Sequence, residues 1–471
     1  YALPGSEFVG VDSSAREILD GQARVEALGL GNITLQHLDI LDVGAELGQF
    51  DYIIAHGVFS WVPRQVQDRI LQVCRENLAP NGVAYVSYNT YPGWHMLASV
   101  REMMLYHTRH ESDPQARAAQ ARELLEFLAS SVPAESGPYG SFLNTYAGFL
   151  RGEFRGEHST GDAFLLHDEL EEVNEPVYFH EFAERAEACG LQYLGETEVR
   201  AMVDTNFPPQ VSAKLREMSG SIIDLEQYMD YLRNQTLRKT LLCHQGVSLS
   251  RTLTSERLRS LFVASYAQPV VPVPDIHAVT VAQFRSADGA VLSTDHPLTK
   301  AAMLHLAEIW PRAISADALL RAACSRLGMG DARLEVEAEV LRTNLLKGHT
   351  YSGYLVELHA FEPPFVLEVS KRPLASPVAR LQAQSGSKVT NLRHERVELD
   401  ELNRYLLARL DGGHDRAALV EALVSGPVAQ GLLVIHPDSQ PVEDVDGVRE
   451  LLADSVEKRL TWLARAGLLV G

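Results

Sequence analysis

The feature that most constrains this chain is an alternation of short apolar segments with amphipathic ones over its first 95 residues. The apolar segments are rich in Val, Ile, Phe and Tyr, as buried parallel strands are. Ser14 stands three residues before Glu17, which is the spacing of a capping box at the start of a helix. The strands are predicted at residues 7–12, 33–38, 50–55 and 83–88, and the clearest helix at residues 65–77. Strands that alternate with helices predict an α/β fold with a doubly wound parallel sheet.

The pattern becomes helical after residue 95. Residues 96–107 and 115–128 have the period of amphipathic helices, and the sequence SGPYG at residues 136–140 predicts a loop. Residues 178–189 predict a helix, and residues 191–197 predict a strand, so the sheet is expected to resume after a helical insertion. Residues 206–266 are predicted to be mostly helical.

A different arrangement begins near residue 275. Three predicted helices are followed by two short apolar segments that we expect to pair as a hairpin, which is typical of a winged-helix-like α+β domain. The helices cover residues 297–309, 315–327 and 332–346, and the hairpin strands cover residues 354–361 and 365–369. In DNA-binding domains of this kind the third helix reads the major groove. Here it carries Glu335, Glu337 and Glu339, whose charge would repel phosphate, so we expect a protein-contact module.

These patterns divide the chain into five expected parts. The cofactor-binding domain is Rossmann-like, and the insertion in it could serve dimerisation or regulation. The expected parts are residues 1–95 with 176–205 (Rossmann-like domain), 96–175 (helical insertion), 206–274 (helical middle segment), 275–371 (winged-helix-like domain) and 372–471 (C-terminal helical or winged-helix-like domain, with helices at 399–410, 414–423 and 445–466).

Composition argues against several classes of function. Lys and Arg number 42 and Asp and Glu number 62, which gives a formal net charge of −20. A chain this acidic is a poor partner for nucleic acid or anionic membranes. No apolar run reaches the about 18 residues that a spanning helix needs, so no membrane insertion is expected. The four cysteines are far apart and show no C-x-x-C spacing, which argues against a metal site and favours a reducing cytoplasm.

Acidic residues follow two of the predicted strands. Asp12 ends the first strand, with Ser13 after it, and Asp39 follows the second, with Ile40 after it. At the carboxyl end of a parallel strand, an acid can accept hydrogen bonds from the ribose hydroxyls of a nucleotide cofactor. Helix capping and a solvated loop acid are the alternatives.

The segments after the third and fourth strands carry further candidates. Gly57 permits close approach of the backbone, and His56 could contact a cofactor or substrate, although a packed loop histidine is also possible. The sequence YNTYPGWH at residues 88–95 is rich in aromatic and amide groups, so we expect it to line a pocket rather than form an ordinary packed turn. Residues 166–176 carry five carboxylates, which could meet a cationic substrate or form a solvated helix face.

Several of these strings resemble known proteins. FVGVD from Phe8, FDYIIAHGVFSWV from Phe50 and LAPNGVAYVSYN from Leu78 are similar to the second, fourth and fifth strand motifs of class I methyltransferases, which use S-adenosylmethionine. Residues 88–103 and 171–182 resemble a narrower family, the bacterial methyltransferases with a methyltransferase regulatory domain. That family includes rickettsial lysine methyltransferases of outer-membrane proteins, and the resemblance covers nearly the whole chain.

The resemblance implies methyl transfer from S-adenosylmethionine to a protein lysine. The lysine amine has a pKa of about 10.4 and must lose its proton first, which an apolar aromatic channel favours by desolvation. The rings could also hold the cation before it is deprotonated. The candidate catalytic residues are Phe59, Trp61, Tyr88, Tyr91 and Trp94 as the channel and Asn89 to orient the amine. The candidate cofactor-binding residues are Asp12, Ser13, Asp39, Ile40, His56 and Gly57.

Other functions stay open at this point. A small molecule could be the methyl acceptor, and a scaffold that has lost cofactor binding could keep its acidic C-terminal part for protein contacts. NAD would also use Asp12, but the strings around His56 and Tyr88 resemble methyltransferases rather than dehydrogenases.

One departure from the family pattern concerns the start of the chain. Only eleven residues precede Asp12, and they contain no glycine-rich loop of the kind that follows the first strand in class I methyltransferases. We therefore expect the first strand to be missing and this chain to bind S-adenosylmethionine poorly. The family resemblance also suggests a homodimer formed through the helical insertion.

Overall fold

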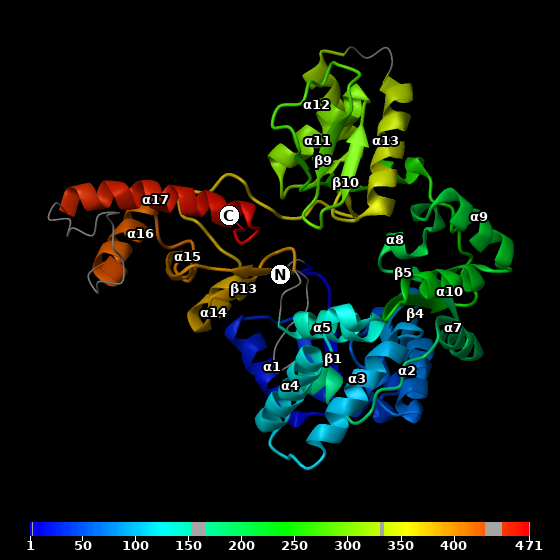
Figure 1. Ribbon diagram of the computed structural model, residues 1–471. Helices are drawn as coiled ribbons and strands as arrows, with labels where there is room; N and C mark the ends of the chain where they lie inside the picture. The colour runs from blue at the N-terminus through cyan, green and yellow to red at the C-terminus, as the bar shows by residue number, and fades with distance from the viewer. Residues whose placement is uncertain (2, 152–164, 330–333, 429–444, 471) are drawn as a thin grey trace. The chain divides into compact units, whose positions relative to one another are not determined.

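The computed structural model describes residues 1–471 except 2, 152–164, 330–333, 429–444 and 471 (Figure 1). It contains two compact units. One is Leu38–Ser250, and the other combines Tyr1–His37 with Arg251–Gly471. The predicted α/β class is confirmed. Within the described part of the chain, no helix is both long and apolar enough to cross a membrane.

The first 37 residues form a β–α–β motif. Strands β1 (Phe8–Asp12) and β2 (Ile33–His37) pair in parallel, and helix α1 (Ala15–Ala27) connects them. The Ser14 side chain accepts a hydrogen bond from the Glu17 backbone N–H, so the predicted helix start is confirmed.

The unit Leu38–Ser250 is built on a four-stranded mixed sheet of order β3-β4-β6-β5. Strands β3 (Phe50–Ala55) and β4 (Leu78–Asn89) are parallel, whereas β6 (Leu237–His244) pairs antiparallel with both β4 and β5 (Leu191–Glu196). The sheet therefore resumes at β5 as expected. The expectation that residues 206–266 are mostly helical is wrong at β6, because this segment fills the gap between β4 and β5.

Two helices cover the sheet core. They are α2 (Arg64–Asn77) and α7 (Phe179–Ala188). Leu71 of α2 and Phe182 of α7 belong to one apolar cluster with residues of β4. An ion pair of 2.7 Å between Arg185 and Asp68 joins the two helices and helps to lower the pKa of Asp68 against the effect of burial. The C-terminal half of this unit also contains the α-helices α8 (Val199–Met202), α9 (Pro209–Met218) and α10 (Ile222–Arg233).

The helical insertion has an apolar core of its own. It contains α3 (Gly93–Thr108), α4 (Pro114–Ser131) and α5 (Pro138–Leu150), which pack in sequence order as Figure 1 shows. The loop predicted at residues 136–140 is shorter than expected, because Pro138 already occupies the first turn of α5.

Residues 251–361 form an α+β domain. The helices α11 (Pro297–Ile309), α12 (Ala316–Leu327) and α13 (Leu334–Tyr351) agree with prediction, but the hairpin does not. Strand β12 (Glu357–His359) pairs with β7 (Phe262–Ala264), which also pairs with β11 (Ile314–Ser315). The second expected hairpin strand, residues 365–369, is not a strand, because its valines pack into the core of the next domain instead. A separate sheet holds β8 (Gln268–Pro269), β9 (Ala282–Arg285) and β10 (Val291–Thr294).

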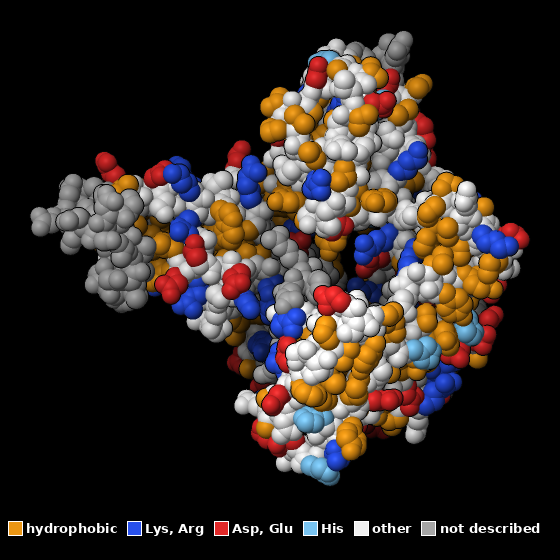
Figure 2. Space-filling view, viewed as in Figure 1, with side chains coloured by type: hydrophobic (Ala, Val, Ile, Leu, Met, Phe, Trp, Pro, Cys, Tyr) orange, Lys and Arg blue, Asp and Glu red, His pale blue; other side chains and the backbone are white. Residues whose placement is uncertain are grey.

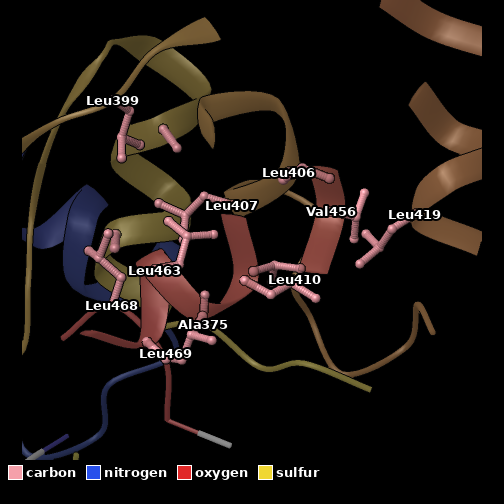
Figure 3. Packing of buried hydrophobic residues seen from close by; sticks show 14 of the residues in the cluster. Ala375, Leu399, Leu406, Leu407, Leu410, Leu419, Val456, Leu463, Leu468 and Leu469 are labelled. Atoms are coloured by element: carbon pink, nitrogen blue, oxygen red, sulfur yellow. The ribbon is translucent and has the colours of Figure 1, made fainter. Parts of the chain in front are cut away.

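The last domain packs around a leucine-rich core (Figure 3). Leu407 points toward Leu463, and Val456 points toward Leu419, so helices distant in sequence share this core. Its elements are α14 (Pro377–Ser385), the hairpin β13 (Lys388–Thr390) and β14 (Arg396–Glu398), α15 (Glu401–Leu407), α16 (Arg416–Leu423) and α17 (Val445–Arg465).

Candidate active site

The carboxyl ends of β3 and β4 meet at one edge of the sheet in the unit Leu38–Ser250. The two strands are parallel, and Ala55 at the end of β3 is in register with Val86 on β4. Short helix η3 (Phe59–Trp61) follows β3, and helix α3 follows β4. Open α/β sheets bind ligands at this edge because the connecting loops diverge there.

Backbone and side-chain polar groups converge after β3. The Gly57 N–H donates to Ser87 Oγ at 2.8 Å, and His56 Nδ1 lies 2.8 Å from the Tyr85 hydroxyl. Gly57 has a φ of 67°, and no atom lies within 4 Å of the place that a Cβ would take. Because His56 is exposed and uses only Nδ1 in this contact, its Nε2 is available to a ligand.

Asp39 begins the short helix η1 (Ile40–Asp42) in the same unit. Its Oδ1 accepts a hydrogen bond of 2.9 Å from the Leu41 N–H, which is the capping role considered as an alternative. The carboxylate is exposed, so its second oxygen can still accept a hydrogen bond from a ligand. Ile40 packs against the apolar core of the sheet, which fixes the start of this turn.

Asp12 and Ser13 belong to the β1–β2 motif. Asp12 Oδ1 accepts from the Ser14 N–H at 2.7 Å, and the Ser13 carbonyl lies 3.0 Å from His37 Nε2. Both residues are exposed at the carboxyl end of a parallel strand. An exposed carboxylate with one oxygen in use can accept a hydrogen bond from a ribose hydroxyl, so this acceptor fits a nucleoside cofactor.

Three of the five predicted channel residues are buried, and two of these lie in the apolar core of the sheet. Phe59 and Tyr88 are buried, and both rings contact Phe182 of α7, with centroids 5.3 Å and 4.0 Å from it. The Tyr88 hydroxyl lies 3.1 Å from Thr240 Oγ1, and burial raises the pKa of Tyr88 well above its usual range. These rings hold β4 against α7, and they are not available as channel walls.

Asn89 is held in place by its neighbours. Its backbone N–H donates to Ser60 Oγ at 2.8 Å, and its Nδ2 donates to Asn174 Oδ1 at 3.0 Å. The segment that carries Asn174 is itself fixed, because the Glu175 N–H donates to the Ser60 carbonyl and the Val177 N–H to the Asn89 carbonyl. This arrangement orients the Asn89 amide at the end of β4.

The remaining predicted aromatic residues gather around this point. Trp61 and Trp94 meet edge to face at 6.0 Å. Tyr91 stacks on His95, with the ring centroids 4.0 Å apart. The Tyr91 ring centroid also lies 5.3 Å from that of Tyr178. Burial raises the pKa of Tyr91 above its usual range. Trp94 is buried, whereas Trp61 and Tyr91 are partly exposed.

Two neighbours of the site, Asn174 and Tyr178, are not among the residues predicted from sequence, whereas His95 belongs to the segment 88–95 that is expected to line a pocket. Asn174 and Tyr178 lie about 85 residues beyond β4 in the chain, yet they contact Asn89 and Tyr91. The available signals are the family-like string at residues 171–182 and, for Asn174, the overlapping acidic segment 166–176, which is expected to meet a cationic substrate or form a solvated helix face.

The acidic side chains of the segment 166–176 differ in their exposure to solvent. Glu172 and Glu175 are exposed, but Glu169 is buried and accepts a hydrogen bond from the Tyr146 hydroxyl. Burial raises the pKa of Glu169 to about 7. The neighbouring Arg101 donates to the Glu171 carbonyl, so part of the segment is bound into the helical insertion.

Comparison with known proteins accounts for these features. Three families match, described as "Methyltransferase domain" (residues 1–84), "Predicted methyltransferase regulatory domain" (161–244) and "PKMT, C-terminal winged helix domain" (371–468). The solved structure of PKMT2 from Rickettsia typhi in complex with AdoHcy is 30% identical, with a TM-score of 0.87, and the match covers 100% of this chain and 90% of that chain. Protein RP789 of Rickettsia prowazekii is 34% identical over 477 residues, which cover 99% of this chain and 83% of the relative.

This chain belongs to the PKMT family of methyltransferases. As a PKMT-family protein it is a methyltransferase whose cofactor is S-adenosylmethionine, since AdoHcy is the product that this cofactor leaves. The predicted family, enzyme class and cofactor are therefore confirmed. The C-terminal winged-helix domain is confirmed as well, although the wing predicted for the domain before it is absent from the described residues.

Proposed function

We propose that this PKMT-family protein transfers methyl groups to lysine side chains of a protein. The observation that carries the proposal is the group of aromatic side chains around the fixed Asn89 amide, at the edge where parallel β3 and β4 end. The matched R. typhi structure supports it, since PKMT abbreviates protein lysine methyltransferase.

We assign cofactor-binding roles to Asp39, Ile40, His56 and Gly57 of the unit Leu38–Ser250 and, separately, to Asp12 and Ser13 of the β1–β2 motif. When bound, S-adenosylmethionine supplies a methyl group on a positively charged sulfur. The exposed carboxylates of Asp12 and Asp39 would accept hydrogen bonds from its hydroxyl or amine groups. His56 Nε2 is a further polar contact.

The acceptor lysine is proposed to enter beside Tyr91, Trp61 and Trp94. Aromatic walls exclude water, which lowers the pKa of an ammonium group and favours the neutral amine. Among the described residues Asn89 Oδ1 makes no hydrogen bond, so it can accept one from the amine and direct its lone pair. Holding the amine in line with the methyl group provides most of the rate enhancement. Phe59 and Tyr88 support these groups from the core.

The test uses the purified protein, radiolabelled S-adenosylmethionine and an array of lysine-containing peptides. Tyr91→Ala should lower kcat by at least about tenfold, because the amine loses one wall and its alignment. It should leave cofactor binding unchanged, since Tyr91 is not among the cofactor residues. Tyr106→Ala, which removes an exposed ring farther along α3, is the matched control and should retain activity.

The products distinguish this proposal from its alternatives. Mass spectrometry of tryptic fragments should locate the label on lysine side chains. Label found only on small molecules, or wild-type turnover in the Tyr91→Ala variant, would contradict the proposed acceptor or the proposed site. The homodimer through residues 96–175 stays a prediction.

A further inference from the structure

A cavity of 400 Å³ lies between helices α7 and α10, in the same unit as the proposed lysine site. Three carboxylates line it, from Glu184, Glu187 and Asp224, and no Lys or Arg does. Glu184 and Glu187 are exposed and form no ion pair within the part of the chain that the structure describes. The lining therefore carries negative charge that no lysine or arginine of the lining neutralises.

A buried amide in the same lining lacks a partner. Gln227 is only 5% exposed, and its Oε1 accepts from the His180 N–H at 3.1 Å. Its Nε2 forms no hydrogen bond with any described residue. A buried donor without a partner is costly, so this amide favours a ligand that brings an acceptor, such as a peptide carbonyl.

Aromatic rings connect the cavity with the lysine site. Tyr91 at the end of β4 lies 5.3 Å from Tyr178, measured between ring centroids. Tyr178 lies 6.2 Å from Tyr231, which lies 6.0 Å from Tyr228. Tyr228 and Tyr231 both line the cavity, and Tyr231 is 47% exposed. We call Tyr91, Tyr178, Tyr228 and Tyr231 the tyrosine strip.

We propose that this cavity binds a basic side chain that flanks the target lysine in an extended polypeptide substrate. The inference rests on the proposed function and specifies its substrate as a lysine with a neighbouring arginine or lysine. The carboxylates match the cationic head group, and the faces of Tyr228 and Tyr231 suit the stem and the cation. Gln227 Nε2 donates to a main-chain carbonyl of the substrate, and the tyrosine strip carries the chain to Tyr91.

The experiment measures binding of two fluorescein-labelled peptides by fluorescence anisotropy. Both consist of glycine and serine around one lysine, with either two arginines or two citrullines beside it. Citrulline has nearly the shape of arginine but no charge. Wild-type chain should prefer the arginine peptide. Glu184→Gln with Glu187→Gln should weaken that binding by about fivefold and leave binding of the citrulline peptide unchanged.

Two further variants complete the test. Glu102→Gln with Glu123→Gln removes the same charge from exposed positions on α3 and α4, and should bind both peptides as the wild type does. Tyr231→Ala should weaken binding of the arginine peptide as well. Equal affinity of the wild type for the two peptides, or an equal loss in the control variant, would overturn the proposal.

Failure of the cavity and failure of the proposed function give different results. Preferential binding of the arginine peptide without label transfer to its lysine would contradict lysine methylation and leave the cavity supported. Efficient lysine methylation of both peptides, unaffected by the Glu184→Gln and Glu187→Gln changes, would contradict the cavity and leave lysine methylation supported.

Discussion

At the scale of single residues, the sheet beneath the site depends on Arg238 of β6. Its guanidinium is 4% exposed and contacts Glu196, Glu226 and Asp230 at distances of 2.8–3.1 Å. The guanidinium carbon Cζ of Arg238 also lies 3.6 Å from the centroid of the Phe179 ring. Burial alone would lower the pKa of Arg238, but the acids raise it well above its usual range. Through Glu196 and Thr240, this network reaches the Tyr88 hydroxyl.

Arg238→Met should therefore destabilise the protein strongly. It leaves three buried acids without their cation, and breaking a buried ion pair in this way costs about 3–5 kcal/mol. Lys239→Met on the same strand is the matched control, since its ion pair with Glu198 is partly exposed and such pairs contribute at most about 1 kcal/mol. Urea unfolding followed by circular dichroism measures both. Similar midpoints for the two variants would show that the network adds little.

At the scale of elements, α3 approaches the chain just before β6 very closely at Gly93. The Gly93 N–H donates to the Gln235 carbonyl at 3.0 Å. A Cβ at this position would lie 2.5 Å from the carbonyl oxygens of Asn234 and Gln235. Only glycine lets the first turn of α3, which carries Trp94, reach this position.

Gly93→Ala should force α3 away from this segment, at a cost of about 1–3 kcal/mol, and should lower methyl transfer because Trp94 moves with the helix. Gly246→Ala, in the turn after β6, adds the same methyl group where nothing lies within 4 Å, and should be neutral. Thermal unfolding and turnover measure the two effects. A Gly93→Ala variant as stable and active as Gly246→Ala would refute the close approach.

How far sequence could anticipate the elements depends on the range of their contacts. The β–α–β motif and the edge with His56 and Gly57 follow from local patterns, and they are predicted well. Strand β6 is not, because it pairs with a strand some 150 residues earlier, where Asn89 is in register with Leu237. The same dependence on distant contacts explains why Tyr88 is buried rather than part of a channel. Its ring belongs to the core because Thr240 and Phe182, both distant in sequence, lie beside it.

At the scale of the whole molecule, two buried acids influence stability in the same direction. Burial raises the pKa of Glu169 in the helical insertion and of Glu226 beside the sheet, each to about 7 from 4.5. The folded protein therefore binds more protons than the unfolded chain between these pH values, so stability falls as pH rises through them. Acids with a lowered pKa, such as Asp411 at about 2, change stability only below this window.

Wild-type protein should thus be less stable at a pH of about 7.5 than at about 5, and Glu169→Gln with Glu226→Gln should remove most of that loss. Glutamine has no proton to lose, so the variant no longer needs to bury two charges. The lowered pKa of His305 acts in the opposite direction, and the net charge of −20 adds repulsion as pH rises, but both persist in the variant. Urea unfolding at both pH values measures the difference. Glu102→Gln with Glu123→Gln should keep the wild-type pH dependence, and a double variant that also keeps it would show that these two acids are not its source.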